Sequence, residues 1–384
     1  MRIEHLSLMN WRNFKTVDIA VGDRLFVVGP NASGKSNLLD ALMFLRDVAT
    51  VGGGLQQALK IRGGVARVRC LAARNFNHGW VGIELDLRTG RSGPTWTYQL
   101  HFTRERREAH RPIIRRELVK KDQHTILDRP DVDDKADKER LTQTSMEQVN
   151  SNREFRPVVE FLAAVRYLHL VPQLIRDPEL AQGPNGGSFG SDFLVRIAKT
   201  PERTRTARLN RINTALRSVV PQLENLSLER DEAGRPHLQA RYRHWRIEGA
   251  RQDEQDFSDG TLRLIGLLWL LQEGSGKAGR VILLEEPELS LHTEIVRRLP
   301  TVLSRAARHG KSQIILSTHS TELLNDPGLG LDEVLVLKPG DEGTTGTAAS
   351  RISDVDSLLG AGMSLAEILG PETAPPSVHQ LTLL

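Results

Sequence analysis

The eight residues Gly29-Pro30-Asn31-Ala32-Ser33-Gly34-Lys35-Ser36 fit the pattern G-x-x-x-x-G-K-[ST] at every position. The stretch Arg24-Leu25-Phe26-Val27-Val28 precedes them and is predicted as a short buried strand. Regularly spaced leucines from 38 to 45 predict a helix with one apolar face. A glycine-rich turn between a strand and a helix directs backbone N–H groups and a helix N-terminus at an anion. The stretch therefore predicts a phosphate-binding loop, with Lys35 between β- and γ-phosphates and Ser36 on Mg²⁺.

A second motif ends an apolar strand predicted at 281–284. Two adjacent carboxylates, Glu285 and Glu286, follow it and precede Pro287. Ligands of open α/β sheets bind at the carboxyl ends of strands. Glu285 is thus a candidate for the Mg²⁺ shell, and Glu286 for polarising a water that attacks a γ-phosphate. The alternative is an ordinary strand end with solvated acids, and the phosphate loop favours the first interpretation.

Two weaker motifs have structural alternatives. Ser258, Asp259 and Gly260 precede an apolar helix predicted at 262–271, where they offer a hydroxyl and an N–H group to an anion. A serine or aspartate is also an ordinary helix cap at that position. His319 follows a predicted strand at 312–317 and is a candidate hydrogen-bond partner for a γ-phosphate, although a lone histidine is more often structural.

Composition restricts the class of protein. The chain has 384 residues, enough for two or three domains or one large domain with insertions. Its longest apolar run, 264–271, has eight residues, whereas a membrane-spanning helix needs about 20. The N-terminus shows no secretory signal. Cys70 is the single cysteine, which excludes an internal disulfide and a thiolate metal cluster. We therefore expect a cytoplasmic protein with no membrane span.

Hydrophobic periodicity outlines the remaining elements. We expect strands within 1–20, an antiparallel sheet arm from 65 to 102, and a charged loop plus helix over 104–152. Other expected elements are a helix running into a strand over 156–170, helical sequence over 192–219, a hairpin over 226–245, strands at 280–284 and 332–337, and loop-like tails over 340–350 and 371–384.

The order of the four motifs resembles the order in ABC-type ATPase heads. The details look like the RecF/OLD-like branch of AAA-family ATPases, of the defence-system type without a TOPRIM domain. Matching blocks extend over most of 1–370 and are 10–14, 257–263, 285–292, 318–320 and 362–367. The fold class that this implies is α/β: a P-loop NTPase, ABC-ATPase-like head with a mixed β-sheet, an antiparallel β arm and an inserted helical lobe.

The resemblance also implies a division of the chain. The expected parts are 1–103, an ATPase lobe with the phosphate loop and β arm; 104–155, a charged insertion; 156–272, a strand, helical lobe and signature motif; 273–370, the half with the acidic strand end and His319; and 371–384, a tail.

The resemblance implies roles for individual residues. The catalytic candidates are Glu286, Lys35 and His319. The nucleotide-binding candidates are Gly29, Pro30, Asn31, Ala32, Ser33, Gly34, Lys35, Ser36, Asn37, Arg12, Asn13, Ser258, Asp259 and Gly260. The metal-binding candidates are Ser36, Glu285 and Gln173, the last taken as the Q-loop residue. The implied ligands are ATP and Mg²⁺, and Ser258 to Gly260 would meet ATP across a dimer of two copies.

This sequence also departs from the family pattern. The position of Glu285 usually holds aspartate, and the extra methylene works against tight octahedral Mg²⁺ geometry, which predicts slow turnover. The 220 or so residues between Lys35 and Ser258 show no heptad pattern, which argues against a long coiled-coil arm. Only 65 residues follow His319, too few for a TOPRIM domain, so any nuclease is expected to be a separate partner chain.

Two functions fit these observations. One is an ATPase whose ATP-dependent head dimerisation gates a partner effector, such as a nuclease, in anti-phage defence. The alternative is a RecF-like DNA-binding ATPase in repair or replication, and a plain nucleotide-binding scaffold is a third interpretation. A DNA partner would suit a stretch of net charge +6 at 196–217, whose basic residues are Arg196, Lys199, Arg203, Arg205, Arg208, Arg211 and Arg217. A solvated helix face explains that stretch equally well.

Overall fold

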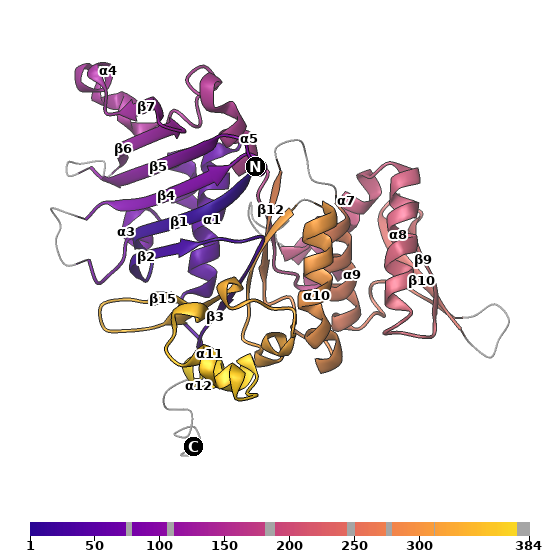
Figure 1. Ribbon diagram of the computed structural model, residues 1–384. Coiled ribbons are helices and arrows are strands. Elements are labelled where there is room, and N and C mark those ends of the chain that lie inside the picture. The colour runs from indigo at the N-terminus through magenta and orange to yellow at the C-terminus, as the bar shows by residue number, and fades with distance from the viewer. Residues whose placement is uncertain are drawn as a thin grey trace, which may run out of the picture. The chain divides into compact units, whose positions relative to one another are not determined.

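The computed structural model describes residues 1–73, 79–105, 111–180, 189–243, 250–273, 279–310 and 312–374. Two compact units make up the chain. The first contains Met1–Arg166, Ser275–Leu283 and Lys311–Leu384, and the second contains Tyr167–Gly274 and Leu284–Gly310. Segments from both ends of the sequence therefore build the first unit (Figure 1).

A six-stranded antiparallel sheet with the order β2-β1-β4-β5-β6-β7 forms one part of the first unit (Figure 1). Leu85 and Leu87 of β4 are buried, whereas Asp86 between them is exposed, which is the alternation of a sheet with one solvated face. The strands are β1 (Arg2–Trp11), β2 (Phe14–Ala20), β4 (Val81–Arg88), β5 (Thr95–Arg104), β6 (Pro112–Lys121) and β7 (His124–Arg129).

Helix α1 (Lys35–Ala49) packs against this antiparallel sheet through its apolar face. The ring of Phe44 lies 5.3 Å from that of Trp11 on β1 and 5.4 Å from that of Phe102 on β5, measured between centroids. All three rings are buried, as are Leu38 and Leu42. The predicted leucine face is therefore buried, and Phe44 beside it makes the aromatic contacts between α1 and the sheet.

The second sheet carries the predicted motifs at its strand ends. Its order is β15-β14-β3-β13-β12-β8, and β3 (Arg24–Val28) pairs in parallel with both β13 (Ser312–Ser317) and β14 (Val334–Lys338). Because β3 and β13 are parallel, the phosphate loop and His319 leave the sheet at the same edge. The remaining strands are β15 (Thr345–Ala348), antiparallel to β14, β12 (Arg280–Glu285), which ends in the second unit, and β8 (Arg166–Leu168).

Short helices complete the first unit. They are α2 (Leu55–Ile61), α3 (Val65–Val68), α4 (Val132–Ala136), α5 (Arg156–Ala163), α11 (Val355–Gly360) and α12 (Leu365–Thr373). Helix α12 begins with a capping box in which Ser364 accepts from the Glu367 N–H group and Glu367 accepts from that of Ser364.

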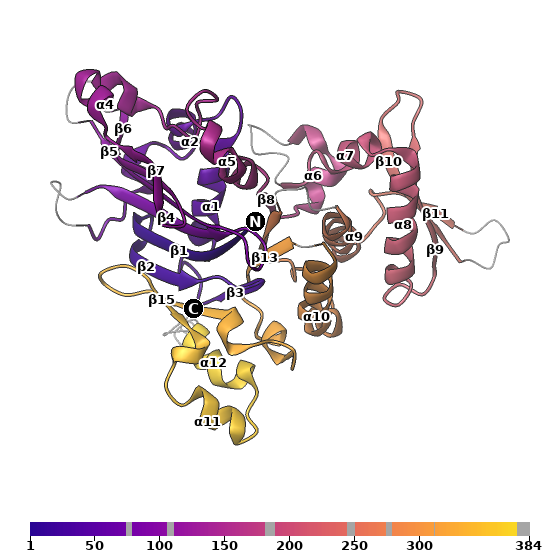
Figure 2. The ribbon, with the colours of Figure 1, turned by 45° about the horizontal axis from the view of Figure 1, so that its top comes forward.

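The second unit is mainly helical (Figure 2). Its helices are α6 (Pro172–Arg176), α7 (Phe193–Lys199), α8 (Glu202–Leu216), α9 (Asp259–Gln272) and α10 (Thr293–Gly310). A three-stranded sheet, β11-β10-β9, consists of β9 (Leu223–Arg230), β10 (Pro236–Tyr242) and β11 (Ala250–Gln252). The predicted hairpin is thus confirmed as β9 and β10.

Three expectations about elements were wrong, and a fourth, the helical sequence over 192–219, was confirmed but as two helices. The stretch 104–152 contains β6 and β7 as well as α4, because Arg115, Arg116 and Lys121 of β6 are exposed while Ile114, Leu118 and Val119 are buried. Residues 65–68 form helix α3 and not sheet. The loop-like stretch 340–350 contains β15. The helical sequence over 192–219 is two helices, because Pro201 begins a new one.

Among the described residues, no helix has the length and apolar character needed to span a membrane.

Candidate functional site

The loop before α1 has backbone angles and close contacts that require glycine at two positions. Gly29 and Gly34 have φ angles of +154° and +97°, and an added Cβ would lie 2.6 Å from the Leu337 carbonyl oxygen or 2.1 Å from Asn13 Nδ2. Ala32, between them, has a φ of +62°. The glycines are therefore required by close approach as well as by backbone angle.

The predicted residues Lys35 and His319 come together at this loop. Lys35 is buried at the first position of α1, and its Nζ donates to the carbonyl oxygens of Gly29 at 2.8 Å and Pro30 at 2.9 Å. The same Nζ lies 3.3 Å from Nδ1 of His319, whose side chain is exposed. The neighbouring Ser36 is also exposed. The Lys35 ammonium group, the His319 ring and the Ser36 hydroxyl are thus all contributed at or next to this loop.

Asn13 holds the loop from the β1–β2 turn. Its Nδ2 donates to the Ser33 carbonyl oxygen at 2.9 Å and to Thr344 Oγ1 at 2.6 Å, while its Oδ1 accepts from Asn37 Nδ2 at 2.9 Å. The neighbouring Arg12 pairs with Asp40 of α1, with Nη2 2.7 Å from Oδ2. Both residues therefore position the loop, and the ion pair with Asp40 is a contact that the sequence did not predict.

A cavity of about 550 Å³ adjoins the loop in the first unit. Arg12, Asn13, Ala32 and Asn37 line it on the side of the loop. Its other lining residues include Arg67, Arg69, Cys70, Gly340, Asp341 and Thr344. The volume falls within the roughly 300–1,000 Å³ of small-molecule sites.

Two buried serine hydroxyls, one of them in the loop, lack a hydrogen-bond partner within the described part of the chain. Ser33 Oγ, within the loop, and Ser317 Oγ, at the end of β13, are buried and have no hydrogen-bond partner among the described residues. Buried polar atoms in native proteins are nearly always paired. The Ser33 hydroxyl and the Lys35 ammonium group are donors of the loop itself, and their chemistry suits phosphate oxygens.

In the second unit, Tyr167 orients the first of the two predicted acids. The Tyr167 hydroxyl donates to the carboxylate of Glu285, and Nδ1 of His169 lies 3.4 Å from the Glu285 backbone oxygen. Glu286 has a φ of +44°, which is uncommon for a residue with a Cβ. No spacing rule in the sequence points to Tyr167, because β8 and β12 are far apart in the chain.

Arg263 is a further residue that the sequence analysis missed. It lines a small cavity with Glu285 and Pro287, and its Nε is buried without a partner among the described atoms. Burial lowers the pKa of Arg263, and the charges of Asp259, Glu286 and Glu288 oppose that change. A guanidinium group on α9 thus faces the acidic strand end.

The predicted signature begins α9. Ser258 is exposed and caps the helix, since its Oγ accepts from the Thr261 N–H group at 3.2 Å. Asp259 pairs with Arg176 Nη1 at 2.8 Å, and Arg176 Nη2 donates to the Phe257 carbonyl oxygen at 2.6 Å. The cap interpretation of Ser258 is therefore confirmed, and contact with a phosphate stays a prediction.

Gly260 allows a loop of the second unit to approach the signature. A Cβ added there would lie 2.4 Å from the Ser290 carbonyl oxygen. Ser290 itself has a φ of +62°. The segment 289–292, which belongs to the matching block 285–292, thus packs directly on the start of α9.

The predicted site residues divide between the two units. The first unit holds the loop 29–37 together with Arg12, Asn13 and His319. The second holds Gln173, Glu285, Glu286 and 258–260. Gln173 is exposed on α6, and its backbone oxygen accepts from the Asp177 N–H group at 2.8 Å. Its role as a metal ligand stays a prediction.

Comparison with known proteins identifies a family and a fold. The family model described as "AAA domain, putative AbiEii toxin, Type IV TA system" matches residues 25–325. A second, described as "P-loop containing region of AAA domain", matches residues 3–46. No curated protein matches the chain.

Similar solved structures include heads of SMC proteins. An SmcHead bound to the C-winged helix domain of ScpA is 13% identical with a TM-score of 0.54, and the match covers 90% of this chain and 98% of that one. An Smc head with an extended coiled coil, bound to a ScpA domain from Pyrococcus furiosus, is 12% identical with a TM-score of 0.50 over 94% and 99%. The SMC head from Thermotoga maritima is 16% identical with a TM-score of 0.49 over 91% and 99%. The first two show the predicted fold, an ABC-ATPase-like head.

Proposed function

This chain belongs to the AAA-domain family described as "putative AbiEii toxin, Type IV TA system", a family of P-loop ATPases, and from that premise we propose that it binds and hydrolyses ATP with Mg²⁺. The observation that carries the proposal is the loop in which Lys35 and His319 meet and the Ser33 hydroxyl is buried without a partner. The neighbouring cavity has room for the rest of a nucleotide.

Each side chain has a task in this proposal. Lys35 exchanges its contacts with Gly29 and Pro30 for phosphate oxygens, and the backbone N–H groups of the loop bind the same anion. Glu286 accepts a proton from the attacking water, and His319 donates a hydrogen bond to the γ-phosphate. Ser36, Glu285 and Gln173 would hold Mg²⁺. When bound, that ion neutralises charge on the phosphates.

Two substitutions test the proposal. Lys35→Ala removes the cation of the loop, so fluorescent ATP should bind at least about tenfold more weakly. Glu286→Gln keeps the shape of the side chain and removes the base, so ATP should still bind while the rate of phosphate release falls about 100-fold or more.

Lys15→Ala serves as the control, because this exposed lysine pairs with Glu342 and does not line the cavity beside the loop. Wild-type ATP binding and hydrolysis by Lys35→Ala would contradict the proposal.

The finer function that we propose is gating of a separate effector in anti-phage defence. It is supported by the toxin and type IV system named in the family description. It predicts that the purified chain hydrolyses ATP but cuts neither DNA nor RNA with Mg²⁺ or Mn²⁺. Nuclease activity that purifies with this chain alone and survives Lys35→Ala would contradict it.

Direct DNA binding through α7 and α8 has less support from the structure. Four of the seven basic side chains of 196–217 make contacts within the second unit. Arg196 pairs with Glu273, Arg208 lies over the Trp269 ring, and Arg217 donates to the Glu224 carbonyl oxygen. Arg205 donates to backbone oxygens near the end of α7. The basic residues of this stretch are better explained as a helix face that is partly solvated and partly paired with other residues of the second unit.

A further inference from the structure

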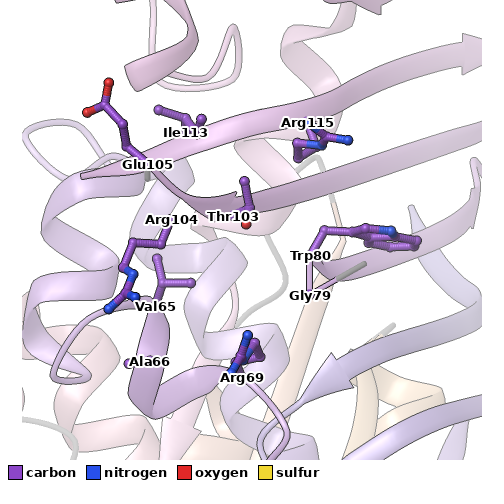
Figure 3. A pocket seen from close by; sticks show the side chains of 10 residues that line it. All are labelled: Val65, Ala66, Arg69, Gly79, Trp80, Thr103, Arg104, Glu105, Ile113 and Arg115. Atoms are coloured by element: carbon purple, nitrogen blue, oxygen red, sulfur yellow. The ribbon is translucent and has the colours of Figure 1, made fainter. Parts of the chain in front are cut away.

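A second cavity of the first unit lies apart from the phosphate loop (Figure 3). Its volume is about 500 Å³, and none of the residues 29–37 line it. The walls come from α3, the segment before β4, the end of β5 and the start of β6. The lining residues are Val65, Ala66, Arg69, Gly79, Trp80, Thr103, Arg104, Glu105, Ile113 and Arg115.

The lining is strongly basic. Arg69, Arg104 and Arg115 supply three guanidinium groups, and Arg104 and Arg115 are exposed to solvent. The acid among the lining residues, Glu105, accepts from Arg111 Nε at 3.3 Å, so its charge is already opposed. In Figure 3 the Arg104 side chain extends toward Val65 and Ala66, whereas the Glu105 carboxyl group points away. The cavity therefore attracts an anion, and guanidinium forks bind phosphate in a bidentate manner.

The same cavity offers an aromatic and apolar surface. The half-buried Trp80 ring stacks on His101, with 4.3 Å between centroids and 23° between planes. His101 in turn pairs with Glu84 at 2.8 Å, which holds this stack in place. Val65 and Ile113 add aliphatic surface. Aromatic rings beside arginines are the combination that binds nucleobases with their phosphates.

We propose that this cavity binds a nucleoside phosphate, either as a free nucleotide or as part of a single nucleic-acid strand. The base packs on Trp80 and the aliphatic side chains, and the phosphate is held by the three arginines. The volume suits one nucleotide unit, being within the roughly 300–1,000 Å³ of ligand sites.

The cavity is connected to the phosphate loop through α3. Ala66 and Arg69 line both this cavity and the one beside the loop. The Arg12 N–H group donates to the Val68 carbonyl oxygen at 2.6 Å, and Trp11 and Arg69 form a β-bridge. An occupant that orders α3 would therefore also order the Arg12–Asn13 turn that holds the loop. This coupling, unlike the binding itself, rests on the proposed ATPase function.

The test uses full-length protein carrying Lys35→Ala, so that the phosphate loop does not contribute to binding. A fluorescein-labelled ten-nucleotide single-stranded DNA is titrated by anisotropy at physiological salt, and AMP is titrated separately by calorimetry. Arg104→Glu and Arg115→Glu are compared with Arg116→Glu. Arg116 is the charge-matched control, because it is exposed, pairs with Asp128 at 3.5 Å and does not line the cavity. Thermal melting confirms that each variant folds.

We expect Arg104→Glu and Arg115→Glu each to weaken binding by about tenfold or more, and Arg116→Glu to have much less effect. Binding of AMP identifies a free nucleotide as the ligand, binding of DNA alone identifies a strand, and either supports the proposal. Absence of binding by both probes overturns it, as does equal weakening by Arg115→Glu and Arg116→Glu. A wild type that fails to hydrolyse ATP would defeat the proposed function and leave this binding test intact.

Discussion

Side chains outside the sequence motifs also contact the predicted site residues. The hydroxyl of Tyr167 donates to Glu285, so the predicted Mg²⁺ carboxylate is held by a partner from β8. Such partners orient metal ligands and raise metal affinity. Glu285 is also one methylene longer than the usual aspartate, so its orientation depends more on this hydrogen bond.

The variant Tyr167→Phe tests that dependence. It keeps the ring and removes only the hydrogen bond to Glu285, so the Mg²⁺ concentration for half-maximal ATP hydrolysis should rise by on the order of tenfold. The rate at saturating Mg²⁺ should stay close to that of the wild type. Tyr242→Phe, on β10, should change neither quantity. An unchanged Mg²⁺ titration of Tyr167→Phe would show that the hydroxyl does not orient Glu285.

A buried charge cluster stabilises the first unit. Arg129 donates to Asp134 at 2.7 Å and to Glu117 at 3.2 Å, and all three side chains are buried. Hydrogen bonds from Arg129 hold the pKa of Asp134 well below its usual range, against the opposing effect of burial. Burial raises the pKa of Glu117, against hydrogen bonds from Ser145 and Met146 and the charge of Arg129.

Asp134→Asn should therefore destabilise the protein in a pH-dependent way. A carboxyl group with a lowered pKa in the folded state stabilises that state above its unfolded pKa of about 3.9 and loses this contribution as the pH falls. The variant should lose about 1–3 kcal/mol at pH 7 and less at pH 3. Melting midpoints at the two pH values measure this, with the exposed Asp128→Asn as control. An equal loss at both pH values would contradict the assignment.

Helix α9 begins with the predicted signature, and several contacts hold its first turn in place. Its first turn carries the Ser258 cap, the Asp259–Arg176 ion pair and Gly260, and its interior carries buried leucines. The hairpin of β9 and β10 holds the loop before α9, because Glu254 accepts from the Leu238 N–H group at 2.8 Å and pairs with His237. Burial opposes protonation of His237, but Glu254 and Asp231 outweigh it and raise its pKa.

Gly260→Ala tests the packing of the segment 289–292 on α9. The added Cβ would clash with the Ser290 backbone oxygen, so overpacking should cost about 1–3 kcal/mol and reduce ATP hydrolysis. Gly370→Ala is the matched control, because Gly370 lies in α12 with nothing within 4 Å of the added Cβ. That control should be neutral or slightly stabilising, since alanine favours helix. Thermal melts and phosphate release measure both; equal behaviour of the two variants would refute the packing argument.

For the entire chain, we propose that function requires a second copy. Ser258 is exposed at the start of α9, where its hydroxyl and the neighbouring N–H groups are accessible to an ATP held by another molecule. A two-fold arrangement would then bury two ATP molecules, each completed by the signature of the other copy. Loss of the γ-phosphate would remove those contacts and loosen the pair.

The dimer prediction uses Glu286→Gln, which we expect to bind ATP without turning it over. Light scattering should show this variant at twice the monomer mass with ATP, and Lys35→Ala should stay monomeric. Adding Ser258→Arg should abolish the dimer, because bulk and charge would occupy the shared contact. If a partner keeps two copies together in all states, a distance probe across the interface replaces mass. A Glu286→Gln protein that responds to ATP by neither measure would contradict the trans arrangement.

Local motifs were enough to predict the phosphate loop and its flanking strand and helix, whereas the ABC-ATPase-like fold was implied by a resemblance in the order of four motifs. A glycine at fixed spacing, a buried strand and a helix with one apolar face are properties of contiguous residues, so they can be recognised without coordinates. The hairpin of β9 and β10 was predicted for the same reason. The charged strands β6 and β7 were missed. Which of their side chains are buried depends on the face of the sheet on which each lies, and that is known only once the strands are paired.

Contacts between distant segments were decided by the tertiary structure alone. Tyr167 meets Glu285 across 118 positions, Lys35 meets His319 across 284, and Asn13 meets Thr344 across 331. The second basic cavity likewise joins α3 to the ends of β5 and β6. No periodicity or spacing encodes such pairs, because hydrogen bonds and ion pairs depend on side chains that only packing of the whole sheet brings within about 3 Å.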